Sequence, residues 1–267
     1  MSASLARIRC FLLDMDGTFN LGERLIDGSL RFIDTLRAQG KDFVFLTNNS
    51  SKNRDLYAAK ITRLGLPIPV DKVFTAGEAT ALYLKRHDAG KPIYLVGTPA
   101  LEDEFRSHGF TLTEDGAGLV VLGFDTTLTY AKLWKLCDYV RAGLPYVATH
   151  PDFNCPTETG FMPDIGAMIA FVKAATGREP DVVVGKPNRL IVDALADKLG
   201  LRLEDIAMVG DRLYTDIALG PAAGIVTCLV LSGETHPEDL AGSPFQPTYT
   251  FADLGALADW LVEHAAG

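Results

Sequence analysis

The sequence has 267 residues, of which 48% are hydrophobic and 22% are charged, so we expect a folded globular protein rather than a disordered chain. Its 25 Lys and Arg residues against 34 Asp and Glu residues give a formal net charge of −9, which argues against nucleic acids and anionic membranes as partners. The four cysteines form no CxxC pair, and neither an export signal nor an apolar run of about 20 residues occurs, so we expect reduced thiols and a cytoplasmic protein.

Short apolar runs typical of buried strands alternate with segments of helical period along the chain. The expected strands are 8–13, 43–46, 72–75, 93–96, 119–123, 146–149, 182–184, 206–209 and 225–231. The expected helices include 29–39, 54–64, 130–142, 188–199 and 215–223. This alternation predicts an α/β fold with a doubly wound, mainly parallel sheet that helices cover on both faces. Without a flexible linker in the sequence, a second domain is expected as an insertion.

The first polar segment to follow an expected strand is Asp14-Met15-Asp16-Gly17-Thr18. Two carboxylates at one strand end can divide the roles of nucleophile and acid/base, and Gly17 lets the chain turn away sharply. A solvated turn is the alternative for this segment by itself. A calcium-binding loop fits poorly, because Leu12 would occupy its first ligand position and has no side-chain oxygen.

Three further polar segments follow expected strands in the same way. They are Thr47-Asn48-Asn49-Ser50-Ser51, Gly185-Lys186-Pro187-Asn188 and Gly210-Asp211 with Asp216 in the next helix. Each one could be ordinary helix capping or a surface lysine if it stood alone. Because the carboxyl ends of parallel strands meet at one edge of a sheet, all four segments are expected to converge. Four carboxylates and a single lysine in one cleft require a divalent cation, and oxygen ligands suit Mg²⁺.

In order and spacing, these four segments resemble the motifs of the haloacid dehalogenase (HAD) superfamily of aspartate-nucleophile phosphohydrolases, in particular its class IIA branch of NagD-like and p-nitrophenylphosphatase-like sugar phosphatases. The resemblance implies a Rossmann-like core and hydrolysis of a small phosphorylated metabolite. It also implies that Asp14 attacks phosphorus to form an aspartyl phosphate. Asp16 would then protonate the leaving oxygen and activate the hydrolytic water, while Lys186 neutralises negative charge.

The same resemblance implies the remaining roles in the site. Thr47, Asn48 and Asn49 would hold phosphoryl oxygens. Mg²⁺ would be bound by the Asp14 carboxylate, the Asp16 carbonyl and Asp211, with Asp216 supporting these ligands.

An inserted α/β cap domain is expected from the length of the chain between the second and third motifs. The resemblance places the core at 1–78 and 182–267 and the cap at 79–181, with hinges near Gly77 and Gly185. In the cap, the polar segment after 146–149 suggests that His150, Asp152 and Asn154 contact the leaving group. A capped turn leading to a helix near 165–175 is the alternative. By family analogy, a homodimer through the cap is also expected.

Two other functions remain open on the sequence. A phosphomutase or other phosphotransferase could use the same core, if its cap kept water away from Asp14. A phospho-receiver-like signalling protein also combines acids, a threonine and a lysine at strand ends. Such domains need only about 120 residues and usually pair adjacent acids, whereas Met15 separates Asp14 from Asp16 here.

Overall fold

The computed structural model describes residues 5–157 and 160–264, and the chain divides into two compact units. The first unit comprises the chain up to Thr47, Tyr57–Phe74 and the chain from Lys186 onward. The second unit comprises Asn48–Leu56 and Thr75–Gly185. Its long segment lies within a few residues of the cap expected at 79–181. The short segment Asn48–Leu56 was expected in the core, but its contacts assign it to the second unit.

The first unit is built on a six-stranded sheet with the strand order β14-β13-β12-β1-β4-β5. The pairs β1–β4, β1–β12, β12–β13 and β13–β14 are parallel, which confirms the doubly wound α/β fold. The strands are β1 (Cys10–Leu13), β4 (Asp42–Thr47), β5 (Val73–Thr75), β12 (Ile206–Gly210), β13 (Val226–Val230) and β14 (Tyr249–Phe251).

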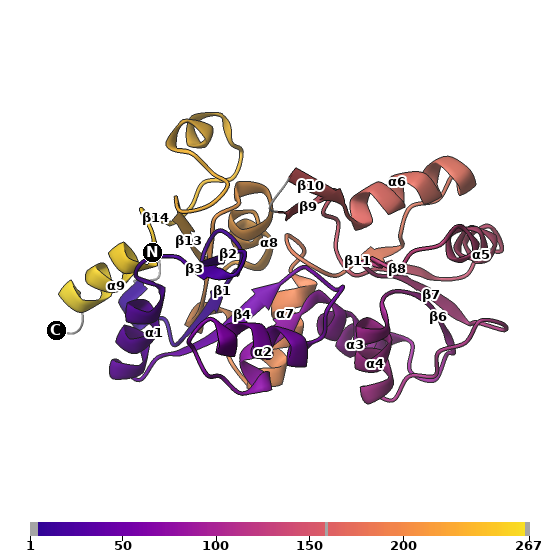
Figure 1. Ribbon diagram of the computed structural model, residues 1–267, viewed down its shortest axis with the longest axis horizontal. Coiled ribbons are helices and arrows are strands. Elements are labelled where there is room, and N and C mark those ends of the chain that lie inside the picture. The colour runs from indigo at the N-terminus through magenta and orange to yellow at the C-terminus, as the bar shows by residue number, and fades with distance from the viewer. Residues whose placement is uncertain (1–4, 158–159, 265–267) are drawn as a thin grey trace. The chain divides into compact units, whose positions relative to one another are not determined.

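Alternate residues of these strands face opposite sides of the sheet. Because both faces carry apolar side chains, helical segments cover each of them. On one face, Phe11 and Leu13 join a core cluster with Phe32 of α1 (Ser29–Ala38) and Leu257 of α9 (Leu254–Glu263). These two helices lie side by side (Figure 1). On the other face, Leu229 packs against Ile217 of the π-helical turn η4 (Leu213–Ile217).

Three further helices belong to the first unit: α2 (Arg54–Arg63), α7 (Leu190–Leu199) and α8 (Leu219–Ala223). The first residues of α2 lie in the segment assigned to the second unit. Short 3₁₀ turns are η1 (Leu5–Arg7), η2 (Val70–Lys72), η3 (Leu203–Asp205) and η5 (Pro237–Gly242). Directly after the first motif, a small antiparallel hairpin pairs β2 (Asn20–Leu21) with β3 (Arg24–Leu25).

The second unit contains a four-stranded parallel sheet with the order β11-β8-β7-β6. Its strands are β6 (Ile93–Val96), β7 (Leu119–Leu122), β8 (Tyr146–Ala148) and β11 (Val182–Val183). The assignment of 182–185 to the core is therefore wrong, because β11 pairs with β8 of the second unit. Lys186 is the residue at which the chain re-enters the first unit.

Helices cover both faces of this second sheet (Figure 1). Val96, Leu122 and Ala148 pack with Leu136 of α5 (Tyr130–Arg141) and Val172 of α6 (Ile165–Thr176). The opposite face carries α3 (Ala76–His87) and α4 (Pro99–Ser107), which contact each other. An antiparallel hairpin of β9 (Asn154–Thr157) and β10 (Gly160–Pro163) precedes α6.

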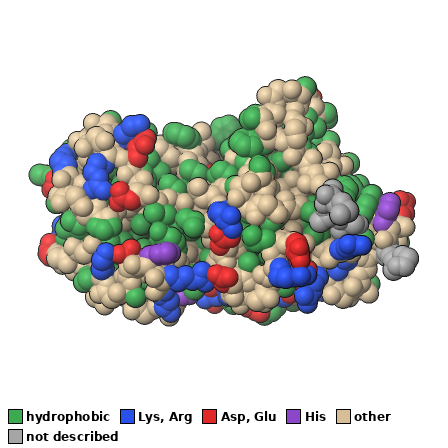
Figure 2. Space-filling model, turned by 180° about the vertical axis from the view of Figure 1, so that it is seen from behind, with side chains coloured by type: hydrophobic (Ala, Val, Ile, Leu, Met, Phe, Trp, Pro, Cys, Tyr) green, Lys and Arg blue, Asp and Glu red, His purple; other side chains and the backbone are tan. Residues whose placement is uncertain are grey.

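Among the described residues, no helix has both the length and the apolar content that crossing a membrane requires. The four cysteines carry free thiols. Figure 2 shows basic side chains interspersed with acidic ones on the face that it displays. The expectation that nucleic acid is not a partner remains a prediction.

Candidate active site

Three of the expected acidic residues meet in the first unit at the carboxyl ends of neighbouring strands. Asp14 follows β1 and Asp211 follows β12, and these strands run parallel in register, with Leu13 opposite Val209. Asp216 returns to the same place from η4. One carboxylate oxygen of each residue lies within 4.8 Å of those of the other two. The convergence predicted from the strand ends is confirmed for these side chains.

Lys186 connects two of these three acids. Its Nζ donates to Oδ1 of Asp14 at 2.6 Å and to Oδ1 of Asp216 at 2.7 Å, and it is 3.3 Å from the carbonyl oxygen of Leu46. Burial opposes the charged form, but the two carboxylates outweigh burial and raise the pKa of Lys186 above its usual range. The lysine is therefore held as a cation against Asp14.

Asp211 is almost fully buried and held from two sides. The hydroxyl of Thr18 donates to its Oδ1 at 3.0 Å, and the backbone N–H of Glu234 donates to its Oδ2 at 2.8 Å. Gly17, with φ of +97°, packs so closely that a Cβ at this position would collide with the Asp211 carboxylate. Burial, with the negative charges of Asp14 and Asp216, raises the pKa of Asp211.

The loop after β13 also supports the site, and the sequence reasoning did not single it out. Besides the bond from Glu234, the hydroxyl of Ser232 donates to the carbonyl oxygen of Gly17 at 2.8 Å. The Glu234 carboxylate lies 3.0 Å from Nε of Arg212 and accepts from the hydroxyl of Tyr214 at 2.8 Å. The signal was available, because the segment is a fifth polar run that directly follows an expected strand.

The carboxylate of Asp16 lies outside this group and is half exposed. Its Oδ1 accepts from Nδ2 of Asn20 at 2.6 Å and from the backbone N–H of Gly22 at 3.2 Å, so the β2–β3 hairpin holds it. Nζ of Lys60, on α2, lies 3.4 Å from the same oxygen. Lys60 was not among the predicted site residues, since nothing in its helical context marks it in the sequence.

The expected phosphate-binding residues fall on both sides of a unit boundary. Thr47 is the last residue of β4 in the first unit, and Asn48 begins the segment that belongs to the second unit. Nδ2 of Asn48 donates to both oxygens of Asp152, at 3.2 and 3.1 Å. Oδ1 of Asn49 accepts from the backbone N–H of Ser51 at 2.9 Å, and its Nδ2 lies 3.6 Å from Sγ of Cys155.

Comparison with known proteins decides the family. A family profile described as haloacid dehalogenase-like hydrolase matches residues 11–111, and one described as HAD-hydrolase-like matches 183–257. An acid sugar phosphatase from Staphylococcus saprophyticus is 36% identical over 93% of this chain and 96% of its own length. The chain belongs to the haloacid dehalogenase-like hydrolases.

Two further relatives show the range of this family. The crystal structure of a 4-nitrophenylphosphatase from Thermotoga maritima is 49% identical, with a TM-score of 0.93 over 96% of this chain and 98% of that one. A 5′-nucleotidase from Bacillus subtilis is 32% identical over 94% of this chain and 96% of its own length. The resemblance read from the four motifs is therefore confirmed.

The acidic group fits the divalent metal that phosphatases of the haloacid dehalogenase family use. Lys186 contacts two of the three carboxylates, Asp14 and Asp216, so the three acids carry more negative charge than this lysine neutralises. Carboxylate oxygens are the ligands that hard divalent cations prefer. Asp14, Asp211 and Asp216 each offer a carboxylate oxygen to the group, and both oxygens of Asp216 also accept hydrogen bonds, from Lys186 and from the backbone N–H of Arg212.

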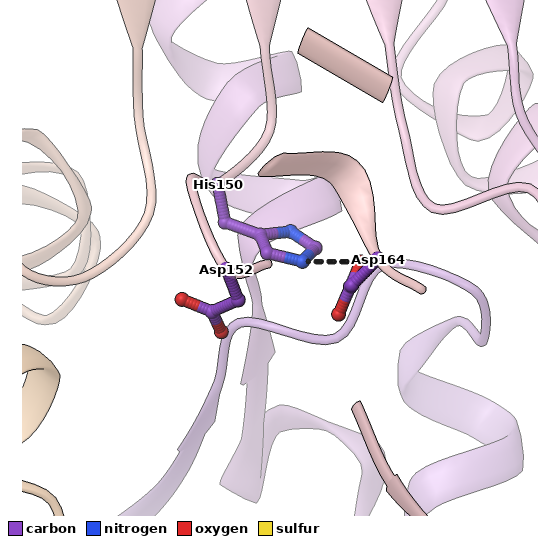
Figure 3. A group of neighbouring side chains, drawn as sticks. All are labelled: His150, Asp152 and Asp164. Atoms are coloured by element: carbon purple, nitrogen blue, oxygen red, sulfur yellow. Dashed lines mark hydrogen bonds and ion pairs between the residues drawn. The ribbon is translucent and has the colours of Figure 1, made fainter. Parts of the chain in front are cut away.

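The residues predicted to contact the leaving group all lie in the second unit of this hydrolase. His150 is fully buried, and its Nε2 lies 3.0 Å from Oδ1 of Asp164, whereas the carboxylate of Asp152 points away from that bond (Figure 3). Asn154 is exposed on β9. The structure therefore brings Asp152 to Asn48 but directs His150 to Asp164, and contact of these three residues with a leaving group remains a prediction.

Proposed function

We propose that this chain is a Mg²⁺-dependent phosphatase that hydrolyses small phosphomonoesters through an aspartyl phosphate on Asp14. The observation that carries the proposal is the buried group in the first unit, in which Lys186 contacts Asp14 while Asp211 lies beside it. A carboxylate flanked by a fixed cation and a divalent-metal site is suited to nucleophilic attack on a phosphoryl group, since both neutralise developing charge.

In the first half of the proposed reaction, an Asp14 oxygen attacks phosphorus and the bond from phosphorus to the ester oxygen breaks. Asp16 gives a proton to the departing oxygen, so the alcohol leaves neutral. Asp16 then takes a proton from water, and that water attacks the phosphorus of the aspartyl phosphate. Inorganic phosphate leaves and Asp14 is regenerated.

The other residues bind and orient in this proposal. Thr47, Asn48 and Asn49 hold phosphoryl oxygens, and Lys186 neutralises charge on Asp14 and on the phosphate. The Asp14 carboxylate, the Asp16 carbonyl and Asp211 hold Mg²⁺, which supplies charge neutralisation when bound. Asp216 orients Lys186 by direct contact.

Sugar or polyol phosphates are the proposed substrates, with p-nitrophenyl phosphate as a generic one. The names of the relatives support this choice, since they include acid sugar phosphatases and a 4-nitrophenylphosphatase. A nucleoside monophosphate is the second candidate, because one relative is named a 5′-nucleotidase. A cytoplasmic location and a homodimer through the second unit belong to the same proposal.

The test is a screen for phosphate release with Mg²⁺ and a panel of phosphomonoesters. The panel contains sugar phosphates, glycerol phosphate, phosphoglycolate, pyridoxal phosphate and nucleoside monophosphates. We expect many turnovers per enzyme molecule on at least one of them. Transfer of the phosphoryl group to a second hydroxyl without free phosphate would instead indicate a phosphomutase, and a single phosphorylation per chain would indicate a receiver-like protein.

A further inference from the structure

A buried chain of hydrogen bonds in the second unit connects Ser50 with the N-terminus of α6. The backbone N–H of Phe124 donates to Oγ of Ser50 at 3.0 Å, and that oxygen lies 2.8 Å from Oγ1 of Thr149. Oγ1 of Thr149 lies 3.2 Å from Nδ1 of His150, whose Nε2 lies 3.0 Å from Oδ1 of Asp164. Ser50, Thr149 and His150 have no exposed surface, and Asp164 has almost none.

The hydrogens of this chain can be placed from its two ends for the tautomer of His150 that carries its hydrogen on Nε2. The carboxylate of Asp164 accepts from the backbone N–H of Ile165, and it also accepts from Nε2–H of His150. In the tautomer that carries its hydrogen on Nε2, Nδ1 is an acceptor, and the hydroxyl of Thr149 donates to it. The hydroxyl of Ser50 in turn donates to Thr149 and accepts from Phe124. This arrangement of protons gives each of these buried groups a hydrogen-bond partner, which favours a fixed position for Ser50.

Asn48 is also held by residues next to His150 in the second unit. Both oxygens of Asp152 accept from its Nδ2, and Asp152 lies two residues after His150 in the chain. On the other side of Asn48, Gly185 packs so closely that a Cβ there would lie 2.7 Å from its Oδ1 and 2.7 Å from Cβ of His150. The backbone of residues 48–50 is therefore held at both ends by side chains from 149–152.

We propose that His150 is a positioning residue for phosphate binding, acting through Thr149 and Ser50 on the backbone of Asn48 and Asn49. This inference rests on the proposed function, in which those two asparagines hold phosphoryl oxygens. Both ring nitrogens of His150 are engaged within the buried chain, so its role is to orient rather than to touch the substrate. Because every phosphomonoester carries the same phosphoryl group, loss of this positioning weakens the binding of all substrates to a similar extent.

Two substitutions separate the two ends of the imidazole ring. The amide oxygen in His150→Asn can take the place of Nδ1 and accept from Thr149, but this variant loses the bond to Asp164. The amide nitrogen in His150→Gln can take the place of Nε2 and donate to Asp164, but this variant loses the acceptor for Thr149. We expect His150→Gln to raise KM for p-nitrophenyl phosphate and the inhibition constant of inorganic phosphate about three- to tenfold, as the loss of one buried hydrogen bond would.

For His150→Asn we expect a lower Tm and a clearly smaller rise in both constants than for His150→Gln. Equal effects of the two variants on KM, or the reverse order, would overturn the proposal. Thr149→Val and Ser50→Ala test the same proposal in a second way, since each breaks the chain of hydrogen bonds by removing one hydroxyl group. We expect both to raise KM, and the double variant to be no worse than the worse single one, because the two act as one unit.

Thr129→Val is the control, because it removes a hydroxyl that accepts from the backbone N–H of Lys132 at the N-terminus of α5 and so makes its bond within that helix rather than to residues 48–56. Amide hydrogen exchange over 48–53 gives a readout that does not depend on catalysis. Exchange there should increase in Thr149→Val and not in Thr129→Val. If the wild type releases no phosphate, the proposed function fails. If the wild type is active but exchange and KM in Thr149→Val match the control, the positioning role fails.

Discussion

Nζ of Lys186 lies 2.6 Å from Oδ1 of Asp14, although 172 positions separate the two residues in the chain. Asp14 stands at the end of β1, whereas Lys186 follows β11, a strand of the other unit's sheet. Asp216 contacts the same lysine, since its Oδ1 accepts from Nζ at 2.7 Å. Lys186, a buried cation, is therefore shared by the proposed nucleophile and by Asp216, an acid that has no exposed surface.

Substitution of Lys186 by Met should reduce both stability and activity. It leaves Asp14 and Asp216 without their shared cation in a buried place, and breaking such a pair costs about 3–5 kcal/mol in free energy of unfolding. Urea unfolding and phosphate release measure the two effects. Lys173→Met is the control, since it removes a lysine from an exposed ion pair with Glu179 and should cost less than about 1 kcal/mol. A Lys186→Met protein as stable as this control would contradict the expected strength of the buried contact.

Asp14→Asn should abolish turnover and leave the fold intact. The amide keeps the size of the side chain but is no longer a nucleophile, so we expect phosphate release to fall by at least about a thousandfold. Stability should change little, because the loss of a partner for Lys186 is offset by weaker repulsion from Asp211. Phosphate release and Tm measure these effects, with Asp34→Asn, at an exposed position on α1, as the control. Substantial activity in Asp14→Asn would remove the nucleophile assignment.

Removal of divalent cations should stop turnover, and added Mg²⁺ should restore it. The acids of the site carry more negative charge than Lys186 neutralises, so a bound cation should also stabilise the folded state and raise Tm with concentration. Asp211→Asn should reduce this rise in Tm, since it removes a proposed ligand, and Mn²⁺ and Ca²⁺ serve as comparison ions. Turnover that continues unchanged in a chelator would reject the metal requirement.

The acidic part of the site was predictable because it depends on strand ends alone. Asp14 and Asp211 each follow an apolar run, and parallel pairing of β1 with β12 then brings them together whatever lies between them. The same rule would have found the loop with Glu234, had it been applied after β13. The strand-end rule could not have found Lys60, because this residue lies on a helix. Its contact with Asp16 depends on how α2 packs in the fold.

The division into units was harder to predict, because it depends on pairing between distant segments. Val182–Val183 is a short apolar run that fits either sheet, and only its pairing with β8 assigns it to the second unit. The residues after Thr47 were expected in the core, because they belong to a polar segment that directly follows the expected strand 43–46. Their partners Thr149 and Asp152 lie about 100 positions away, so no local pattern in the sequence indicates these bonds.

Substitution of Trp134 by Glu should prevent the homodimer proposed through the second unit. Trp134 and Tyr130 on α5 and Phe171 on α6 are 63%, 75% and 43% exposed and border a surface cavity of about 230 Å³. Burial of such aromatic side chains against a second copy would stabilise a dimer, and a charge would oppose it. Light scattering should give twice the 28.9 kDa of one chain for the wild type and a single chain for the variant. Val262→Glu, at an exposed position of α9 in the first unit, is the control, and a monomeric wild type would refute the dimer.

A buried pair of glutamates near the start of the second unit predicts how stability depends on pH. Oε2 of Glu104 accepts from the hydroxyl of Thr75 at 3.0 Å, and its Oε1 lies 3.4 Å from Nε of Arg54. The guanidinium of Arg54 also contacts Glu78, at 3.0 Å, so one cation serves two buried carboxylates. Burial, with the charge of Glu78, raises the pKa of Glu104 to about 7, although Thr75 and Arg54 act in the opposite direction.

Between about pH 4.5 and 7, the carboxyl of Glu104 keeps its proton in the folded protein but has lost it in the unfolded chain. Unfolding in this range therefore releases a proton. The contribution of Glu104 to stability is therefore fully present below about pH 4.5 and is lost as pH rises through about 7. Glu104→Gln cannot ionise, so between pH 4.5 and 8 its free energy of unfolding should gain about 1–3 kcal/mol relative to wild type. Urea unfolding at several pH values measures this difference. Glu102→Gln, a more exposed partner of Arg106 on the same helix, should follow the wild-type pH dependence. If the Glu104→Gln and wild-type curves stay parallel, the raised pKa is wrong.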